Sequence, residues 1–197
     1  MKKSMAGQGA AGALLLAGLM MNAGAMAASG DPVQGGSGSV TINVPIVTST
    51  CSVAVPTEVN FDPVNKNSIV IYPSMILTTK DMNITLSNCS GKILVMSTRA
   101  HEVSTAHRTI GNFSSGDPDH ALQYQIYVPR SAEITDGHSL SGDYWLADLA
   151  NTSPLIIKPT SDSYQIASEI YLESSGKDAS NLGSTVSGGF DYVFDYQ

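Results

Sequence analysis

Positive charge is scarce in this sequence. Its 197 residues include 10 Lys and Arg against 17 Asp and Glu, which gives a formal net charge of −7 at pH 7. Nucleic acids and anionic lipid surfaces attract proteins mainly through clustered basic side chains. The composition therefore offers no electrostatic basis for either kind of binding, and we expect no nucleic-acid partner.

Motifs of catalysis and of metal binding are also missing. The sequence has no Gly-x-Ser-x-Gly, no His-Glu-x-x-His and no phosphate-binding glycine loop. Asp119 and His120 could suggest acid–base chemistry or a metal loop, but no second Cys/His cluster supplies ligands at a suitable spacing. We expect no enzyme activity, no catalytic residues, no cofactor and no metal. All four histidines lie in Ser- and Gly-rich turn regions, where side chains are usually solvated: His101, His107, His120 and His138.

Long apolar runs are confined to the N-terminus. Lys2 and Lys3 precede an apolar stretch that ends in Ala25-Met26-Ala27, a small-x-small cleavage pattern. The alternative is a transmembrane anchor, but Gly and Ala interrupt the stretch and no stop-transfer flank follows it. The pattern predicts a secretory signal peptide over residues 1–28, and therefore an exported chain.

Cysteine occurs only twice, at Cys51 and Cys89. An even count in an exported chain favours a disulfide. A shared metal is the rival interpretation, but it requires more ligands and no histidine lies near either cysteine. We expect a Cys51–Cys89 disulfide, which the chain-entropy model values at roughly 3–4 kcal/mol for a loop of this length.

What the sequence does contain is β-strand patterning. Residues 29–38 are rich in Gly and Ser and cannot form a core. Strict alternation then begins, which is typical of a half-buried strand. We expect an N-terminal extension over residues 29–50. The apolar positions of its strand are Val40, Ile42, Val44 and Ile46.

The remainder, residues 51–197, repeats this signature in short pieces separated by turns rich in Gly, Pro, Asp and Ser. Helical periodicity is nearly absent. The pattern predicts one all-β domain, a sandwich or a barrel. The expected strands are 51–55, 68–72, 82–86, 92–96, 122–128, 155–158, 164–172 and 190–196.

The last of these strands has two unlike faces. One face carries Asp191, Val193 and Asp195, and the other carries only aromatic residues. Such an aromatic face requires burial, and an unpaired edge strand of this kind would aggregate. We therefore expect another segment or chain to cover it. The aromatic residues are Phe190, Tyr192, Phe194 and Tyr196.

The order of these features resembles that of the subunits of chaperone–usher pili, in the type 1-like group of fimbrial pilins. The likeness covers the signal peptide, the alternating extension and Cys51 shortly after it. It also covers the strand that ends at Cys89 and the aromatic ending with its penultimate Tyr196. The resemblance implies an incomplete immunoglobulin-like β-sandwich that is completed by a donor strand from a neighbouring subunit.

The resemblance also implies roles for residues and partners. Val40, Ile42, Val44 and Ile46 would be the donor strand, inserted into a neighbour by β-augmentation. The strand Phe190–Tyr196 would border the acceptor groove and dock a periplasmic chaperone. Further partners would be an outer-membrane usher and identical or related pilus subunits, in a fimbria on the cell surface. Two departures concern the donor register: many relatives carry Gly where this chain has Val44, and Pro45 removes one ladder hydrogen bond.

The expected function is that of a structural subunit of an adhesive fimbria that polymerises by donor-strand exchange. Within the same class, the alternatives are a minor, tip-proximal subunit and a polymerising subunit that also binds a host receptor. From another class, a secreted single-disulfide β-sandwich enzyme or a free-standing binding module would fold alone and stay monomeric.

Overall fold

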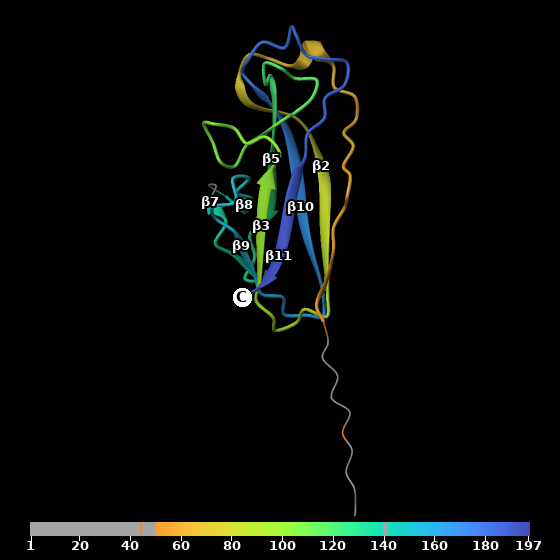
Figure 1. The fold of residues 1–197 in the computed structure, drawn as a ribbon, viewed down its shortest axis with the longest axis vertical. Coiled ribbons are helices and arrows are strands. Elements are labelled where there is room, and N and C mark those ends of the chain that lie inside the picture. Colours follow the sequence, from red (N-terminus) through yellow and green to blue (C-terminus); the bar gives the residue numbers. More distant parts are fainter. Residues whose placement is uncertain (1–43, 45–49, 140–141) are drawn as a thin grey trace, which may run out of the picture. The chain divides into compact units, whose positions relative to one another are not determined.

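A computed structural model describes residue 44 and residues 50–139 and 142–197. The chain divides into two units, 1–46 and 47–197, and the account below concerns the second. The one helical element among the described residues is a short 3-10 helix, η1 (Lys66–Ser68) (Figure 1). The strands are β1 (Ser52–Ala54), β2 (Pro73–Ser87), β3 (Leu94–Ala100), β4 (Gly111–Asn112), β5 (Leu122–Pro129), β6 (Ile134–Thr135), β7 (His138–Ser139), β8 (Tyr144–Leu146), β9 (Leu155–Ile157), β10 (Ser163–Ser175) and β11 (Phe190–Tyr196).

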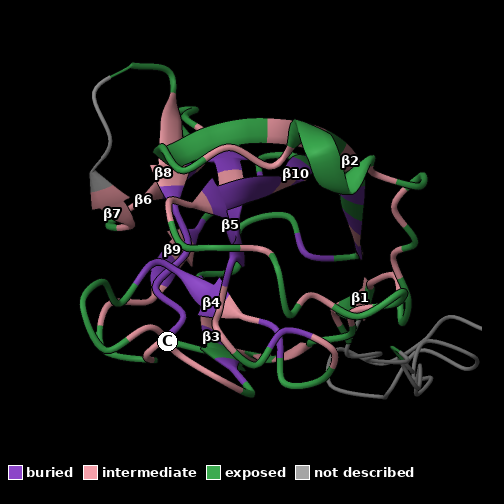
Figure 2. Ribbon diagram, turned by 90° about the horizontal axis from the view of Figure 1, so that it is seen from above, coloured by how far each residue is buried: buried purple, intermediate pink, exposed green. Residues whose placement is uncertain are grey.

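The strands form two antiparallel sheets. The larger sheet has the order β1-β2-β10-β5-β8-β7, and β4 also pairs with β5. The smaller sheet has the order β11-β3-β9-β6. Buried side chains of both sheets belong to one core cluster, with exposed residues at the rim (Figure 2). The predicted all-β sandwich is therefore confirmed.

Alternation along the strands builds this core. In β2 the buried residues Met82, Ile84 and Leu86 alternate with more exposed neighbours, and β3 buries Leu94 and Met96 in the same way. Period-two alternation places such residues on one face of a sheet. Each large apolar side chain buried in this way contributes about 1.5–3 kcal/mol.

The segment before β2 corrects one predicted strand. Residues 68–72 were expected to form a strand ended by Pro73, but the helix η1 ends at Ser68 and Pro73 is the first residue of β2. Asn65 explains the helix, because its side chain caps η1 by accepting a hydrogen bond from the Asn67 N–H (2.9 Å). Proline is compatible with the first position of a strand, where its missing N–H is tolerated.

The disulfide joins Cys51, just before β1, to Cys89, just after β2. Cys89 is fully buried. This pairing agrees with the expectation from the sequence. It fastens the start of the domain to the end of its longest strand.

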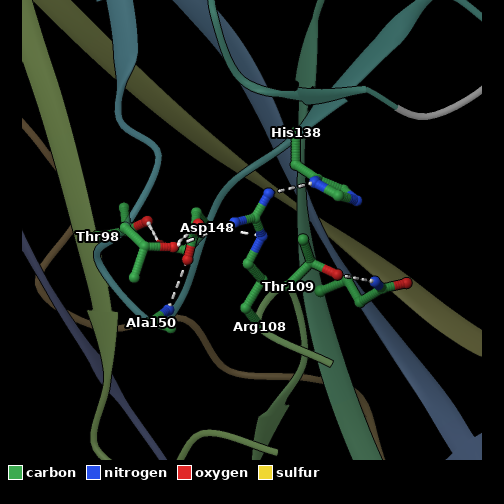
Figure 3. Close-up of polar contacts among 8 residues, drawn as sticks. Thr98, Arg108, Thr109, His138, Asp148 and Ala150 are labelled. Atoms are coloured by element: carbon green, nitrogen blue, oxygen red, sulfur yellow. Dashed lines mark hydrogen bonds and ion pairs between the residues drawn. The ribbon is translucent and has the colours of Figure 1, made fainter. Parts of the chain in front are cut away.

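A buried carboxylate ties the smaller sheet to the loop before β4 (Figure 3). The side chain of Asp148 accepts hydrogen bonds from the Ala150 N–H (2.9 Å) and the Thr152 hydroxyl (2.6 Å). It also pairs with Arg108 Nε (3.4 Å), while its backbone carbonyl accepts from the Thr98 hydroxyl of β3 (2.8 Å). The Asp148 side chain is only 1% exposed, so these contacts satisfy a charge that would otherwise be costly to bury.

Candidate strand-acceptor groove

A groove of about 1200 Å³ lies between the segment of residues 56–69 and the segment that leads into β11. Its floor belongs to the hydrophobic core of the larger sheet. A large concave site with an apolar floor and polar groups at its walls is a typical place for a ligand or partner to bind. The floor residues are Met82, Phe113, Leu122, Tyr124, Ile170 and Leu172.

The first wall, residues 56–69, has no strand and contains only the helix η1. Four apolar side chains on it are partly buried and pack against the core. Sequence reasoning assigned no role to Val59, Phe61 and Val64, and it placed Ile69 in the expected strand 68–72. The sequence pattern that marks them is an apolar residue every few positions between Pro56 and Pro73, with Pro63 among them, and this spacing is too irregular for strand periodicity. They are Val59, Phe61, Val64 and Ile69.

The second wall is residues 182–189 followed by the start of β11. β11 lies at the edge of the smaller sheet, where it pairs with β3 in a register that opposes Phe190 to Ala100 and Tyr196 to Leu94. Within the described part of the chain, no strand pairs with its other edge. The backbone groups along that edge are therefore available to a further strand.

The four aromatic residues of β11 have different surroundings. Phe190 and Tyr192 line the groove, and Phe194 packs against the core. Tyr196 is 59% exposed, and its hydroxyl accepts a hydrogen bond from the Cys51 N–H (3.1 Å). The expected alternation in exposure is present from Phe190 to Asp195, but from β11 the groove is lined only by Phe190, Asp191 and Tyr192, and it includes neither Phe194 nor Tyr196.

Tyr124 contacts the residues Gly189 and Phe190 at the start of β11. Its hydroxyl donates to the Gly189 carbonyl (2.8 Å), and its ring packs against Phe113 and Phe190, with centroids 5.6 and 6.2 Å away. Burial, together with the nearby negative charge of Glu102, raises the pKa of Tyr124 well above its usual value. The hydroxyl therefore stays protonated and remains a donor to the second wall.

A loop that contains Gly116 supports the second wall from outside. The Gly183 N–H donates to the Gly116 carbonyl (2.8 Å), and Ser115 pairs with Ser187 through a β-bridge. Gly116 has a φ of +79°, and a Cβ there would lie 2.0 Å from the Thr185 carbonyl oxygen. Only glycine fits both the backbone conformation and the close approach.

Lys66 joins the two walls at one end of the groove. Its ammonium group extends from η1 and donates to the backbone carbonyls of Ser180 (2.8 Å) and Leu182 (3.3 Å). Asp178 lies nearby, and its pKa is lowered by hydrogen bonds from Ser180 and by the charge of Lys66. The groove is therefore bounded at this end by a fixed cation.

The residues expected to donate a strand lie mostly outside the described residues. This applies to Val40, Ile42 and Ile46; Val44 is described and its side chain is exposed. Val44 belongs to the first unit, whose position relative to the groove is not defined. The donor assignment therefore stays a prediction.

The histidines are dispersed and make separate contacts. His101 lies 3.3 Å from Asp191, His120 lies 3.2 Å from Glu102, and His138 lies 3.1 Å from Arg108. Among the residues that the structure describes, no three His, Cys, Asp or Glu side chains are grouped to hold a metal ion. The described helix is also too short to cross a membrane.

Comparison with known proteins identifies the fold. No family model matches the sequence, and no curated protein matches it. A chain of a chaperone–usher pilus superposes with a TM-score of 0.54 at 13% identity, covering 85% of this chain and 99% of the pilus chain. The P pilus rod subunit PapA superposes with a TM-score of 0.51 at 12% identity, covering 75% and 99%. The domain has the fold of chaperone–usher pilus subunits.

Proposed function

We propose that this chain is a structural subunit of a cell-surface pilus that polymerises by donor-strand exchange. The segment with Val40, Ile42, Val44 and Ile46 of one copy fills the groove of the next, beside β11. The observation that carries the proposal is the combination of an apolar groove with an unpaired strand edge along its wall. The fold shared with pilus subunits supports the same conclusion.

The chemistry of the groove suits an inserted strand. A strand added beside β11 would hydrogen-bond to the free backbone edge and direct alternate side chains at the apolar floor. β11 has 7 residues, and the segment Val40–Ile46 has the same length. A strand of 7 residues extends over roughly 23 Å, so the two would match in length if the segment Val40–Ile46 is inserted as a strand. The donor can therefore cover the whole strand edge.

The groove also accounts for the assembly partners that we propose. Before a donor arrives, the β11 edge and the apolar floor form an aggregation-prone surface. A periplasmic chaperone would cover this surface with a strand of its own, and an outer-membrane usher would oversee its exchange for the donor. The signal peptide over residues 1–28 provides the route into the periplasm, and assembly, not catalysis, is the activity.

The proposal is tested with a synthetic peptide of residues 38–48, added to a refolded chain that begins at Thr50. At a peptide concentration of 100 times its Kd, the domain should gain about 2.7 kcal/mol of stability, visible as a rise in melting temperature. A matched pair of peptides identifies the inserted face: Ile42→Asp should abolish the gain and Asn43→Asp should keep most of it. A domain that melts at the same temperature with and without peptide would contradict the proposal.

A further inference from the structure

Three tyrosines from three strands of the larger sheet are in ring contact with one another. Tyr127 lies on β5, Tyr171 on β10 and Tyr144 on β8. The ring centroids of Tyr127 and Tyr171 are 3.9 Å apart, and those of Tyr127 and Tyr144 are 5.9 Å apart. All three side chains are only partly buried, so together they form one aromatic surface that solvent reaches. We call these three residues the tyrosine cluster.

The tyrosine cluster lies on the face of the sheet that points away from the core. Tyr127 lies between two core residues of β5, and Tyr171 lies between two core residues of β10. Successive side chains of a strand point to opposite faces of the sheet, so both tyrosines point outward. The groove is on the other face, because its floor includes core residues of β10 on either side of Tyr171. The core neighbours are Ile126, Val128, Ile170 and Leu172.

Two carboxylates lie beside the tyrosine cluster. Glu169 is opposite Tyr127 in the pairing of β10 with β5, and it is opposite Asp81 in the pairing of β10 with β2. Like charges directly opposite each other on neighbouring strands are unfavourable. In the part of the chain that the structure describes, no ion pair joins either carboxylate to a basic side chain. A cation placed between Glu169 and Asp81 would relieve their repulsion.

The three strands that carry this surface provide no basic side chain to it. β5 and β10 contain no Lys or Arg. The one Lys or Arg of β2 is Lys80, which is opposite the core residue Ile170 and therefore points to the other face, where it pairs with Asp62 (2.9 Å). The outward face is therefore negatively charged, and the charge that complements it is positive.

A hydrogen bond links the aromatic and acidic parts of the surface. The Tyr171 hydroxyl donates to the Glu169 side chain. Partial burial, together with this hydrogen bond and the charge of Glu169, raises the pKa of Tyr171 to about 12. The hydroxyl therefore stays protonated at neutral pH, and the hydrogen bond keeps the carboxylate next to the Tyr171 ring.

This arrangement suits an arginine side chain. A guanidinium stacks on aromatic rings and donates several N–H groups to carboxylates, whereas the ammonium of lysine is a compact and strongly hydrated charge. We propose that the surface binds an arginine-rich segment of a partner protein, with a guanidinium stacked on Tyr171 and donating to Glu169 and Asp81. The inference goes beyond the proposed function, because a strand inserted in the groove lies on the other face of the sheet.

The test measures the binding of a fluorescent tetra-arginine peptide to the chain from Ser29 to Gln197 by fluorescence anisotropy. Tetra-lysine has the same charge, and tetra-glutamine has none. We expect tetra-arginine to bind most tightly, tetra-lysine more weakly and tetra-glutamine not at all, with binding that weakens as salt is added. Equal affinities for tetra-arginine and tetra-lysine would indicate attraction by net charge alone and would overturn the proposal.

Matched variants locate the binding site. Glu169→Gln and Asp162→Asn each remove one carboxylate, but Asp162 is an exposed residue that precedes β10. Tyr171→Leu and Tyr171→Phe each remove the hydroxyl, but only phenylalanine keeps an aromatic ring. We expect Glu169→Gln and Tyr171→Leu to weaken tetra-arginine binding at least about threefold, and Asp162→Asn and Tyr171→Phe to bind as the wild type does. Equal losses for Glu169→Gln and Asp162→Asn would overturn the proposal.

Two further measurements separate the proposal from a folding defect and from another kind of ligand. The melting temperature of each variant is recorded, and Glu169→Gln decides if Tyr171→Leu proves unstable. Neutral sugars also stack on aromatic rings, so chitotriose is tested as a second probe. Chitotriose binding that is lost in Tyr171→Leu and kept in Glu169→Gln, without tetra-arginine binding, would overturn the proposal and assign the surface to a carbohydrate.

Discussion

At the scale of single residues, Glu173 is a carboxylate placed where ionisation is unfavourable. It is 2% exposed, and the Gln123 side-chain amide donates to it (3.0 Å). Burial raises the pKa of Glu173 above its ordinary value, and the hydrogen bond from Gln123 only partly opposes this. The folded state therefore binds the proton more tightly than the unfolded state does.

The pH dependence of stability follows from the direction of this pKa shift. The contribution of Glu173 favours the folded state below the ordinary Glu pKa and is lost as the pH rises through the raised value. Glu173→Gln should therefore increase the free energy of unfolding at pH 7 and have much less effect at pH 4. Denaturant unfolding of the peptide-bound domain at both pH values measures this, with the exposed Asp162→Asn as control. A loss of stability at pH 7 would contradict the assignment.

Asp148 presents the opposite case, a buried carboxylate whose partners satisfy it. Asp148→Ala leaves the Ala150 N–H, the Thr152 hydroxyl and the Arg108 guanidinium without their acceptor. We expect a loss of about 3 kcal/mol in the free energy of unfolding. Arg108→Ala should cost less, because the Arg108 side chain is about half exposed. Chemical denaturation measures the free energy of unfolding of both variants. Equal losses for Asp148→Ala and Arg108→Ala would contradict the expectation that the buried carboxylate matters more than the half-exposed guanidinium.

At the scale of elements, the packing of β4 on β5 depends on the absence of a side chain. A Cβ at Gly111 would lie 2.2 Å from the Tyr124 ring, whose hydroxyl holds Gly189. Gly111→Ala should therefore cost about 1–3 kcal/mol or more and loosen the wall of the groove. The readouts are the melting temperature and the affinity for the 38–48 peptide. If Gly111→Ala kept the wild-type melting temperature and the wild-type peptide affinity, Tyr124 would not be what holds the second wall of the groove in place.

The two faces of β11 predict different results for neighbouring residues. Phe194 packs against the core, and its burial is worth about 1.5–3 kcal/mol, so Phe194→Asp should weaken folding and donor binding together. Asp195 is exposed, and Asp195→Asn should behave as wild type. Co-purification with the periplasmic chaperone that we propose as a partner and a fibre assay compare the two variants. If Phe194→Asp and Asp195→Asn behaved alike, the assignment of Phe194 to the inward face of β11 and of Asp195 to the outward face would be wrong.

Strands with a strong apolar or aromatic pattern were the most predictable from sequence. β11 has the expected bounds, and residues 122–128 and 164–172 lie inside β5 and β10. The first half of β2 was missed because its side chains there are mostly exposed, so alternation carries no hydrophobic signal. β4 and β6 have 2 residues each, too few to show a period.

The candidate site was predictable only in part. The aromatic strand at the C-terminus has a clear pattern because aromatic residues alternate with other residues, and the aromatic face is half-buried as far as Phe194. The first wall was missed because residues 56–69 form no strand and their apolar side chains follow the shape of the core. The Lys66 contacts link positions more than a hundred residues apart, and no local pattern encodes them.

At the scale of the whole molecule, the proposed function makes the groove of one copy and the N-terminal extension of another complementary parts of one assembly. The domain supplies a strand edge and an apolar floor, and the extension supplies alternating apolar residues of matching length. Because the proposed contact is head-to-tail, each copy that binds a donor would still present its own extension, and growth would have no intrinsic end.

The most direct measurement is the size distribution, by light scattering, of the chain from Ser29 to Gln197 and of the same chain without residues 29–48. Each is released from a chaperone complex under the same conditions. We expect the longer chain to form linear multimers that grow with concentration. The shortened chain should form none by itself, yet should add as a single terminal unit to multimers of the longer one. Multimers of the shortened chain alone, or a longer chain that stays monomeric, would contradict polymerisation by donor-strand exchange.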